Sequence, residues 1–313
     1  MELVTGGAGF IGSHLVDALV SSGKKVRVFD NFSSGRKEFL AHHDGEGTVE
    51  TITGDLLDFD SILEVMKGVD AVHHMAANPD IRLGTEITDT DLKQGTVATY
   101  NVLEAMRLAG VKKISFASSS AIYGEASVMP TPENYGPTLP ISLYGASKMA
   151  CEGLITAWVE NFGAQAYINR FANIVGPRGT HGVIFDFIHK LKDDPMRLEV
   201  LGDGKQEKSY MSAEDCVNAI IHLIESQEEG VNLYNLGTGD TCSVSRIAEI
   251  VIEECGIGNV SIEYTGGKGG WVGDVPKTYL DVSKLKGTGF EPTASSEQAI
   301  RATTRALIDE IGL

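Results

Sequence analysis

Tyr144 and Lys148 are the residues whose types and spacing most directly suggest chemistry. They lie in Tyr144-Gly145-Ala146-Ser147-Lys148, at the start of a long helical stretch, so a spacing of four residues would place both side chains on one helical face. A neighbouring cation favours the phenolate form, which lowers the pKa of the phenol from about 10 toward the range of a general base. The pair predicts a proton-transfer site, although this spacing is also common by chance.

Three consecutive hydroxyl side chains precede this pair, in Ser118-Ser119-Ser120. They follow a predicted strand at Lys113–Ala117, and ligands of open α/β folds bind at the carboxyl ends of such strands. Phenol, ammonium and hydroxyl groups in this arrangement form a far more specific pattern than any one of them alone. We therefore expect an active site where this strand ends.

A glycine-rich turn, Thr5-Gly6-Gly7-Ala8-Gly9-Phe10-Ile11-Gly12, connects the first predicted strand to the first helix. Glycines there let the backbone approach a pyrophosphate at the positive helix N-terminus, which predicts dinucleotide binding. The spacing is GxxGxxG, and a tight strand-to-helix connection without a ligand is the alternative interpretation. A positively charged nicotinamide ring bound nearby would lower the pKa of the Tyr144 phenol further.

Acidic residues follow the second and third predicted strands. Asp30 lies 18 positions after the last glycine of the turn, where a carboxylate accepts hydrogen bonds from both adenosine ribose hydroxyls and repels a 2′-phosphate. Asp55 is placed to meet adenine, and Ala76-Ala77 after the fourth strand lets the cofactor lie against the backbone. These signals favour NAD over NADP, although Arg36 leaves NADP open and Asp30 could instead initiate a turn with Asn31.

Short apolar or β-branched runs alternate with helix-length segments in the first half of the chain, which is typical of parallel βαβ units. The predicted strands lie near Glu2–Thr5, Lys25–Asp30, Glu50–Thr53, Ala71–His74, Lys113–Ala117 and Ala166–Arg170, and the predicted helices include Phe10–Ser22 and Asp91–Gly110. The fold class that follows is α/β, a Rossmann doubly wound parallel sheet with a smaller mixed α/β C-terminal substrate lobe.

Past Arg170, turns rich in glycine and proline separate shorter elements. We expect residues 1–170 to form the NAD-binding domain, joined by about 206–237, where a helix at Ala213–Ser226 and a strand at Val231–Leu236 return to the sheet. Residues 171–205 and 238–313 would then form the lobe that binds the substrate.

Composition disfavours several classes of protein. The formal charge of −17 opposes binding to nucleic acid and anionic membranes, so an anionic ligand must be held by local donors. The sequence opens directly into an apolar strand and has no apolar run of about 20 residues, so we expect a cytoplasmic protein without membrane contact. The four widely spaced cysteines favour buried thiols. His73-His74 would point to opposite faces of a strand, so we expect no catalytic metal.

These motifs together resemble the extended short-chain dehydrogenase/reductase family and, within it, the UDP-glucose 4-epimerases. The resemblance runs from TGGAGFIG at Thr5 through SSSAIYG, YGASK and RFANIVGP to GDVP at Gly273, which is nearly the whole chain. It implies that tightly bound NAD oxidises and re-reduces C4 of a UDP-hexose by way of a 4-keto sugar.

By position, the resemblance implies that Tyr144 is the catalytic acid/base, Lys148 its partner, and Ser119 the hydroxyl that contacts the sugar oxygen. Ser118 and Ser120 are close enough in sequence to compete for that last role. The expected NAD contacts are Gly6, Gly9, Phe10, Ile11, Gly12, Asp30, Asn31, Ser33, Asp55, Leu56, Ala76, Ala77, Asn78, Ser118, Tyr144, Lys148 and Phe171. The expected substrate contacts are Ser119, Ser120, Tyr144, Asn173, Val183, Leu198, Leu201, Lys208, Tyr210, Asp274 and Thr278.

Three positions depart from the family's pattern. Lys208 stands where the family usually has Arg, and Lys offers a point charge in place of a bidentate fork. The basic residue expected shortly before Asp274 is missing, with Lys268 as a candidate substitute. Gly95 replaces an Asn that relatives often have near the active-site end of this helix. Lys208 and Lys268 could equally be surface charges, and Asn173 a turn residue.

Ser120-Ala121 stands where dehydratases that act on 4-keto sugars carry an Asp-Glu pair, so elimination lacks its usual acid and base. This favours C4 epimerisation over a UDP-glucuronate 4-epimerase, dehydratase or reductase activity, which remain the alternatives. Arg82 or Arg178 could hold the carboxylate of a uronate. A noncatalytic NAD-sensing module is the alternative from another class, and the intact catalytic trio disfavours it.

The resemblance also predicts a homodimer, because residues 91–110 and 142–162 match the helices of the family's dimer bundle. Thr278 lies where epimerases carry either Tyr or a small residue beside the C2 substituent of the sugar. A small side chain leaves room, so we hypothesise that N-acetylated UDP-hexoses are accepted alongside UDP-glucose and UDP-galactose. A register shift of one residue would put Lys277 or Tyr279 there and reverse the answer.

Overall fold

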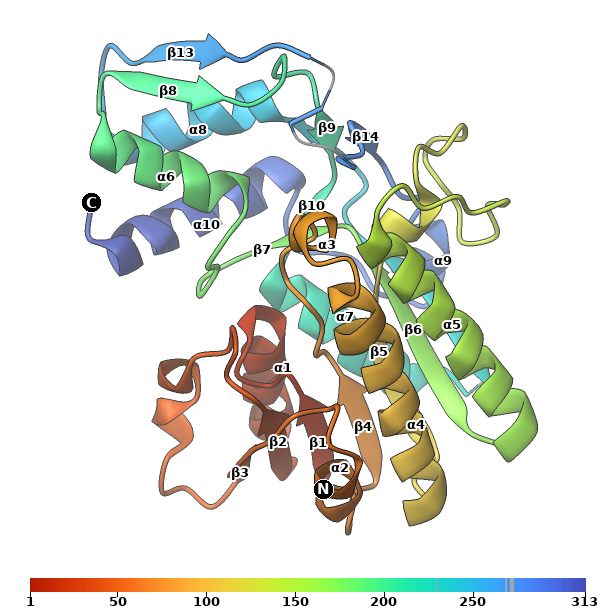
Figure 1. Ribbon diagram of the computed structural model, residues 1–313. Coiled ribbons are helices and arrows are strands. Elements are labelled where there is room, and N and C mark those ends of the chain that lie inside the picture. Colours follow the sequence, from red (N-terminus) through yellow and green to blue (C-terminus); the bar gives the residue numbers. More distant parts are fainter. Residues whose placement is uncertain (229, 268, 271–272) are drawn as a thin grey trace. The chain divides into compact units, whose positions relative to one another are not determined.

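A seven-stranded sheet gathers strands from residues 2–236 (Figure 1). The computed structural model describes residues 1–228, 230–267, 269–270 and 273–313. The sheet has the order β11-β6-β5-β4-β1-β2-β3, and the pairings of β1 with β2 and β4, of β2 with β3 and of β4 with β5 are parallel. Its strands are β1 (Glu2–Thr5), β2 (Val26–Asp30), β3 (Val49–Thr53), β4 (Ala71–His74), β5 (Lys113–Ser119), β6 (Gln165–Phe171) and β11 (Val231–Leu236). This order confirms the predicted Rossmann fold class.

Helices connect these strands and bury their apolar faces against the sheet. They are α1 (Phe10–Ser21), α2 (Phe59–Val65), α3 (Leu83–Glu86), α4 (Ala98–Ala109), α5 (Leu143–Phe162) and α7 (Ala213–Ser226), with shorter turns at η1 (Lys37–Phe39), η2 (Ala41–His43) and η4 (Ser120–Tyr123). Leu3, Phe116 and Ile155 lie in one buried cluster, which joins β1, β5 and α5. The central strands β1, β2 and β4 are mostly buried, whereas the edge strand β3 is largely exposed. A buried parallel strand is a short run of mostly apolar residues, which explains why the central strands were readable from the sequence.

The helix predicted over Asp91–Gly110 has two parts. Residues Leu92–Val97 form a π-helical turn, η3, directly before α4. Gly110 then ends α4 in the left-handed conformation with φ of 75°. A π-helical turn inside a helix commonly accompanies a functional site, and here it brings Gly95 against α5.

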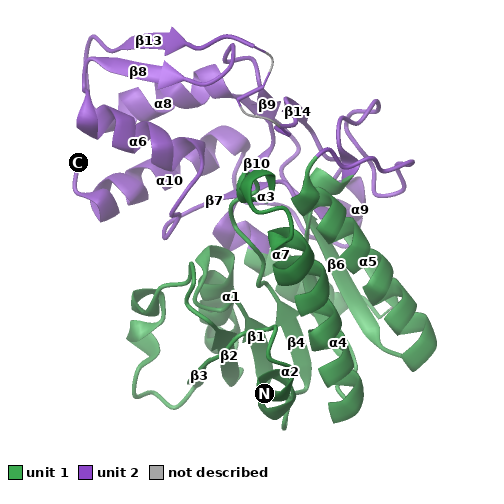
Figure 2. Cartoon of the chain, viewed as in Figure 1, with its two compact units in different colours: residues 1–122, 142–170, 217–234 green, residues 123–141, 171–216, 235–313 purple. Residues whose placement is uncertain are grey.

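The chain divides into two compact units (Figure 2). The first comprises residues 1–122, 142–170 and 217–234, and the second comprises 123–141, 171–216 and 235–313. The second unit contains β7 (Asn173–Val175), α6 (Val183–Asp193), β8 (Arg197–Val200), β9 (Glu207–Lys208), β10 (Tyr210–Ser212), β12 (Cys242–Ser243), α8 (Val244–Cys255), β13 (Ser261–Tyr264), β14 (Lys277–Thr278), α9 (Ser283–Gly287) and α10 (Ser296–Ile311). Helices α6, α8 and α10 share an apolar core that includes Ile188, Ile247 and Ile300.

These units differ from the expected boundaries in two longer segments and at residues 235–237, which lie in the second unit. Residues 206–216 lie in the second unit because β9 pairs with β12 and β14, and β10 pairs with β7. Residues 123–141 also lie there, because Thr131 bridges Leu280 and its backbone N–H donates to the Tyr279 carbonyl. Neither pairing is local in sequence, so neither left a periodic signal.

Two further findings concern the chain as a whole. Within the described ranges, no helix is both long enough and apolar enough to cross a bilayer. All four cysteines are free thiols, and Cys151, Cys216 and Cys242 are buried, as the spacing predicted.

Candidate active site

The glycine-rich turn leaves no room for side chains where it meets the first helix. A Cβ at Gly12 would lie 2.1 Å from the Gly6 carbonyl oxygen, and one at Gly6 would lie 2.7 Å from the Ala76 Cα atom. Gly6 also has φ of 68°, which favours glycine. Among the described residues no side chain caps the N-terminus of α1 at Gly9, so the first backbone N–H groups are left for a ligand. This cradle fits the pyrophosphate of NAD.

Asp30 ends β2 beside this cradle and is largely buried. One carboxylate oxygen accepts from the Ala8 N–H at 3.0 Å and the other from the Phe32 N–H at 2.8 Å. Asp30 therefore does initiate a turn, as the alternative interpretation had it, and it also ties the turn to the glycine-rich loop. A carboxylate has about four acceptor sites, so two remain for ribose hydroxyls.

Four of the expected NAD contacts, Asn31, Ser33, Asp55 and Leu56, follow the ends of β2 and β3. The Asn31 amide donates to Asp55 at 3.1 Å, and the Ser33 N–H donates to the Asn31 side chain at 3.0 Å. Leu56 follows Asp55 and is mostly buried. These contacts order the loop before any ligand binds.

Sequence reasoning missed Asp91, which lies beside the predicted catalytic pair. Its side chain is buried, one oxygen accepts from the Asn78 amide at 3.1 Å, and the other has no hydrogen-bond partner among the described residues. Burial raises the pKa of Asp91, while the Asn78 hydrogen bond and the charge of Lys148 lower it. Asp91 precedes a helix whose sequence has no distinctive motif. Only its neighbours in the folded chain could have identified it as a residue of the site.

Tyr144, Lys148 and Ser119 lie together in the first unit. The Ser142 hydroxyl caps α5 by accepting from the Gly145 N–H at 3.1 Å, which places Tyr144 in the first turn. The Lys148 ammonium lies 5.7 Å from the centre of the Tyr144 ring and donates to the Ala117 carbonyl at 2.6 Å. The Ser119 hydroxyl is close enough to the Tyr144 phenol to lower its pKa. The three groups thus form one proton-handling cluster at the carboxyl end of β5.

The pKa of Tyr144 differs from the expectation for a phenol beside a lysine. Burial raises it to about 12, whereas the Ser119 hydroxyl lowers it. Burial also lowers the pKa of Lys148 to about 8. The protein alone therefore favours neutral phenol, because the loss of hydration raises the pKa of Tyr144 more than the Ser119 hydroxyl lowers it.

The structure distinguishes the three consecutive serines. Ser118 is buried and its hydroxyl donates to Glu152, which also accepts from Arg170 at 2.7 Å. An NAD contact from Ser118 would therefore come from its backbone. The Ser119 oxygen accepts from the Ala121 N–H at 3.1 Å, which leaves the Ser119 proton for an oxygen acceptor. This geometry supports the prediction that Ser119 is the catalytic hydroxyl.

The presence of glycine at position 95, where relatives often have Asn, has a steric explanation. A Cβ at this position would lie 2.1 Å from the Ser147 hydroxyl oxygen. That hydroxyl donates to the Asp91 carbonyl at 2.7 Å and contacts the Thr96 hydroxyl at 3.0 Å. Ser147 thus occupies the space that an Asn at position 95 would need.

The remaining expected residues from Phe171 onward lie in the second unit. Phe171 ends β6 and is mostly buried, and the Asn173 amide donates to the Ser209 carbonyl at 3.3 Å. Val183 begins α6 and is half-buried. Leu198 is fully buried in the core, whereas Leu201 is exposed, so the two do not line the same surface.

Lys208 and Asp274 contact each other. The ammonium lies 2.6 Å from one carboxylate oxygen, and the Gly270 N–H donates to the other at 2.9 Å. Both residues were expected to contact the substrate, and in the structure they contact each other. Lys268, the candidate substitute for the missing basic residue, lies outside the described residues. Tyr210 is buried, which raises its pKa, and its backbone N–H donates to Ser296 at 3.0 Å.

His73 and His74 have separate structural partners. His73 contacts Glu2 at 3.2 Å, whereas His74 lies between the Thr5 and Thr99 hydroxyls at 2.7 and 3.0 Å. Burial lowers the pKa of His74 to about 3. Both side chains therefore belong to the packing of the sheet.

Lys148→Met should raise the stability of the NAD-free protein by about 1 to 3 kcal/mol at pH 7, because the folded pKa of Lys148 lies below the unfolded value. The unfolded chain binds one more proton between pH 8 and about 10.5, so the wild type gains stability as pH rises through this window. Urea unfolding of both proteins from pH 7 to 10.5 checks this. A stability difference that does not change with pH would contradict it.

Comparisons with known proteins identify the family of the chain. Residues 2–237 match the NAD dependent epimerase/dehydratase family. A putative UDP-glucose 4-epimerase from Methanocaldococcus jannaschii is 33% identical over 307 residues, which cover 96% of each chain. A UDP-N-acetyl-alpha-D-glucosaminuronate decarboxylase from Bacillus cytotoxicus is 33% identical over 315 residues, covering 96% of this chain and 95% of the relative. A crystal structure of a UDP-galactose 4-epimerase superposes with a TM-score of 0.88 at 43% identity over 99% of both chains.

Proposed function

Because this chain belongs to the NAD-dependent epimerase/dehydratase family, we propose that it interconverts UDP-glucose and UDP-galactose by C4 epimerisation. The proposal rests on one observation above all. Tyr144, Lys148 and Ser119 form a proton-handling cluster, while Ser120 and Ala121 stand where elimination would need carboxyl groups. Such a site can remove the proton of one hydroxyl group and return it, but it lacks the carboxyl groups for elimination.

In the proposed cycle, Tyr144 removes the proton from the C4 hydroxyl and Ser119 donates a hydrogen bond to the same oxygen. When bound in the glycine-rich cradle, NAD would supply the redox chemistry for oxidation and re-reduction at C4. Tyr144 then returns its proton to the C4 oxygen, so protons and electrons balance over one turnover. Lys148 provides the positive charge that favours the phenolate, and its hydrogen bond to Ala117 fixes its position.

A uronate is the second candidate substrate, since one relative at 33% identity is named for a glucosaminuronate. A uronate needs a cation near C6. Arg82 is exposed and already paired with Asp80 at 3.2 Å, and the Arg178 backbone N–H is bonded to Glu310. The ion pair gives Arg82 a carboxylate partner within the protein itself, and the epimerases among the relatives act on neutral hexoses by name, so we favour a neutral hexose.

Thr278 is the residue on which we base a proposal about the C2 substituent of the sugar. It is half-buried in β14, opposite Lys208 of β9. Its neighbours are held elsewhere: Lys277 pairs with Glu207 at 2.9 Å, and the Tyr279 hydroxyl donates to the Gly239 carbonyl at 3.0 Å. We therefore propose that the small Thr278 side chain borders C2 of the sugar and admits an N-acetyl group.

Product analysis tests the proposed reaction. The purified enzyme is incubated separately with UDP-glucose, UDP-galactose, UDP-N-acetylglucosamine, UDP-glucuronate and dTDP-glucose, and the products are followed by NMR. We expect each accepted UDP-hexose to reach the same C4 equilibrium from either epimer without net NADH formation. A 4-keto-6-deoxy product, release of carbon dioxide, or turnover of UDP-glucuronate alone would overturn the proposal.

We also propose a homodimer formed through α4 and α5, which lie side by side in Figure 1. Large apolar side chains on these helices are exposed in the single chain, namely Tyr100, Leu108, Leu143, Met149 and Phe162. Burying such a surface is favourable, and a second copy of the same helices would do so symmetrically. Sedimentation of the purified protein distinguishes dimer from monomer.

A further inference from the structure

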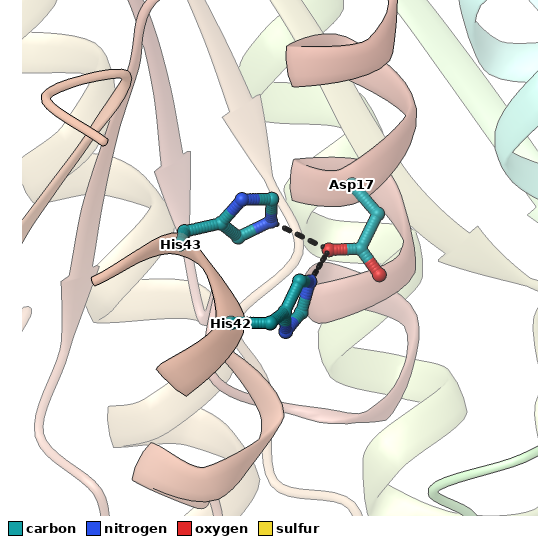
Figure 3. A group of neighbouring side chains, drawn as sticks. All are labelled: Asp17, His42 and His43. Carbon is teal, nitrogen blue, oxygen red and sulfur yellow. Dashed lines mark hydrogen bonds and ion pairs between the residues drawn. The ribbon is translucent and has the colours of Figure 1, made fainter. Parts of the chain in front are cut away.

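We propose that Asp17, His42 and His43 form a binding site for a divalent first-row transition-metal ion such as Zn²⁺ (Figure 3). Asp17 lies on the outer face of α1, and the two histidines end the η2 turn in the segment between β2 and β3. The site goes beyond the proposed epimerase activity and uses none of its residues.

Both imidazole rings converge on one oxygen of the Asp17 carboxylate. The Nε2 atom of His42 lies 2.8 Å from it and that of His43 lies 2.7 Å from it. One ligand atom from each residue can be chosen so that all three lie within 4.8 Å of one another. Zn–N and Zn–O bonds of about 2.0 to 2.2 Å require ligand atoms roughly 3.4 Å apart, so the two rings need to withdraw by only about 0.6 Å.

The surroundings of the rings also suit a metal. His43 is nearly buried, so its imidazole is held in place, whereas His42 is half-exposed and leaves a path from solvent. The Nδ1 atom of His43 lies 3.9 Å from the Glu46 carboxylate. When Nε2 binds a metal, Nδ1 must carry the proton, and a carboxylate partner for that proton is a common feature of metal-binding histidines. Glu46 is placed to be that partner after a small movement.

The donor set selects the class of ion. Two imidazole nitrogens and one carboxylate oxygen suit Zn²⁺ and similar transition metals, whereas Mg²⁺ and Ca²⁺ prefer oxygen ligands. Three protein ligands leave a fourth position for water. The formal charge of −17 raises the local concentration of cations around the whole chain.

A bound ion would join α1 to the segment after β2. That helix begins at the glycine-rich cradle, and that segment begins after Asp30. Both flank the proposed adenosine side of the NAD site. The metal would therefore act as a structural clamp, and its loss should loosen this segment without removing any catalytic group.

Metal binding to tag-free, chelator-treated protein tests the site. We expect one Zn²⁺ per chain by equilibrium dialysis, and one Co²⁺ with visible absorption bands that Zn²⁺ abolishes. We also expect Zn²⁺ to raise the Tm, because it binds the folded chain. Mg²⁺ or Ca²⁺ binding as tightly as Zn²⁺, or Zn²⁺ binding weaker than about 1 mM, would overturn the proposal.

Variants then locate the ion. His42→Gln changes an exposed side chain and should fold normally. We expect His42→Gln and Asp17→Asn, each as a single variant, to weaken Zn²⁺ binding by at least about 100-fold. Glu46→Gln should weaken it about 10-fold. The matched control is His181→Gln, which removes an exposed histidine of the second unit and should bind Zn²⁺ like the wild type. Unchanged affinity in folded His42→Gln, or loss of binding in His181→Gln, would place the ion elsewhere.

Discussion

Turnover of UDP-galactose should fall by at least about 1,000-fold when Tyr144 is replaced by Phe, because the variant loses the group that takes the C4 proton. Ser119 and Lys148 stay in place, and Phe keeps the aromatic ring, so we expect the affinity for the UDP-sugar to change by less than about threefold. Steady-state kinetics gives the loss in kcat, and calorimetric titration with UDP-galactose gives the affinity.

The matched control for this prediction is Tyr264→Phe. Tyr264 is exposed in the second unit, and its hydroxyl contacts Ser245 at 2.9 Å. This variant loses the same oxygen atom at a site without proposed chemistry, so its kcat should stay near the wild-type value. Near wild-type turnover of Tyr144→Phe would show that another group handles the proton.

Thr278→Tyr should selectively reduce activity on UDP-N-acetylglucosamine. An aromatic ring in the space proposed for the N-acetyl group costs about 1 to 3 kcal/mol, which corresponds to roughly 5- to 150-fold in kcat/KM. Activity on UDP-glucose should change little, because its C2 hydroxyl is small. The measurement is kcat/KM for both substrates with wild type and variant.

Thr278→Ser serves as the control, because it keeps a small side chain and should retain both activities. Equal loss of both activities in Thr278→Tyr would show that position 278 supports the fold or binds the whole sugar. A wild type that epimerises UDP-glucose but not its N-acetyl form would refute the assignment of Thr278 alone. The C4 epimerase proposal would stand in that case.

The sequence by itself determined the order of elements in the first unit. The strands predicted at Glu2–Thr5 and Ala71–His74 and the helix at Ala213–Ser226 coincide with β1, β4 and α7. These signals are local: a buried parallel strand is a short apolar run, and a helix repeats its apolar side chains every three to four residues. The glycine-rich turn was equally readable, because its tight geometry tolerates only glycine at Gly6 and Gly12.

Only the tertiary structure decided which neighbouring groups face each other and what burial does to them. Alternation along β5 turns Ser118 toward Glu152 and Ser119 toward Tyr144, which three adjacent serines could not reveal. The contact of Lys208 with Asp274 joins residues 66 positions apart. The pKa of Tyr144 follows from lost hydration, which depends on every element packed around the ring. Long-range distances and burial are properties of the folded chain, so spacing along the sequence could name these residues but could not establish their environment.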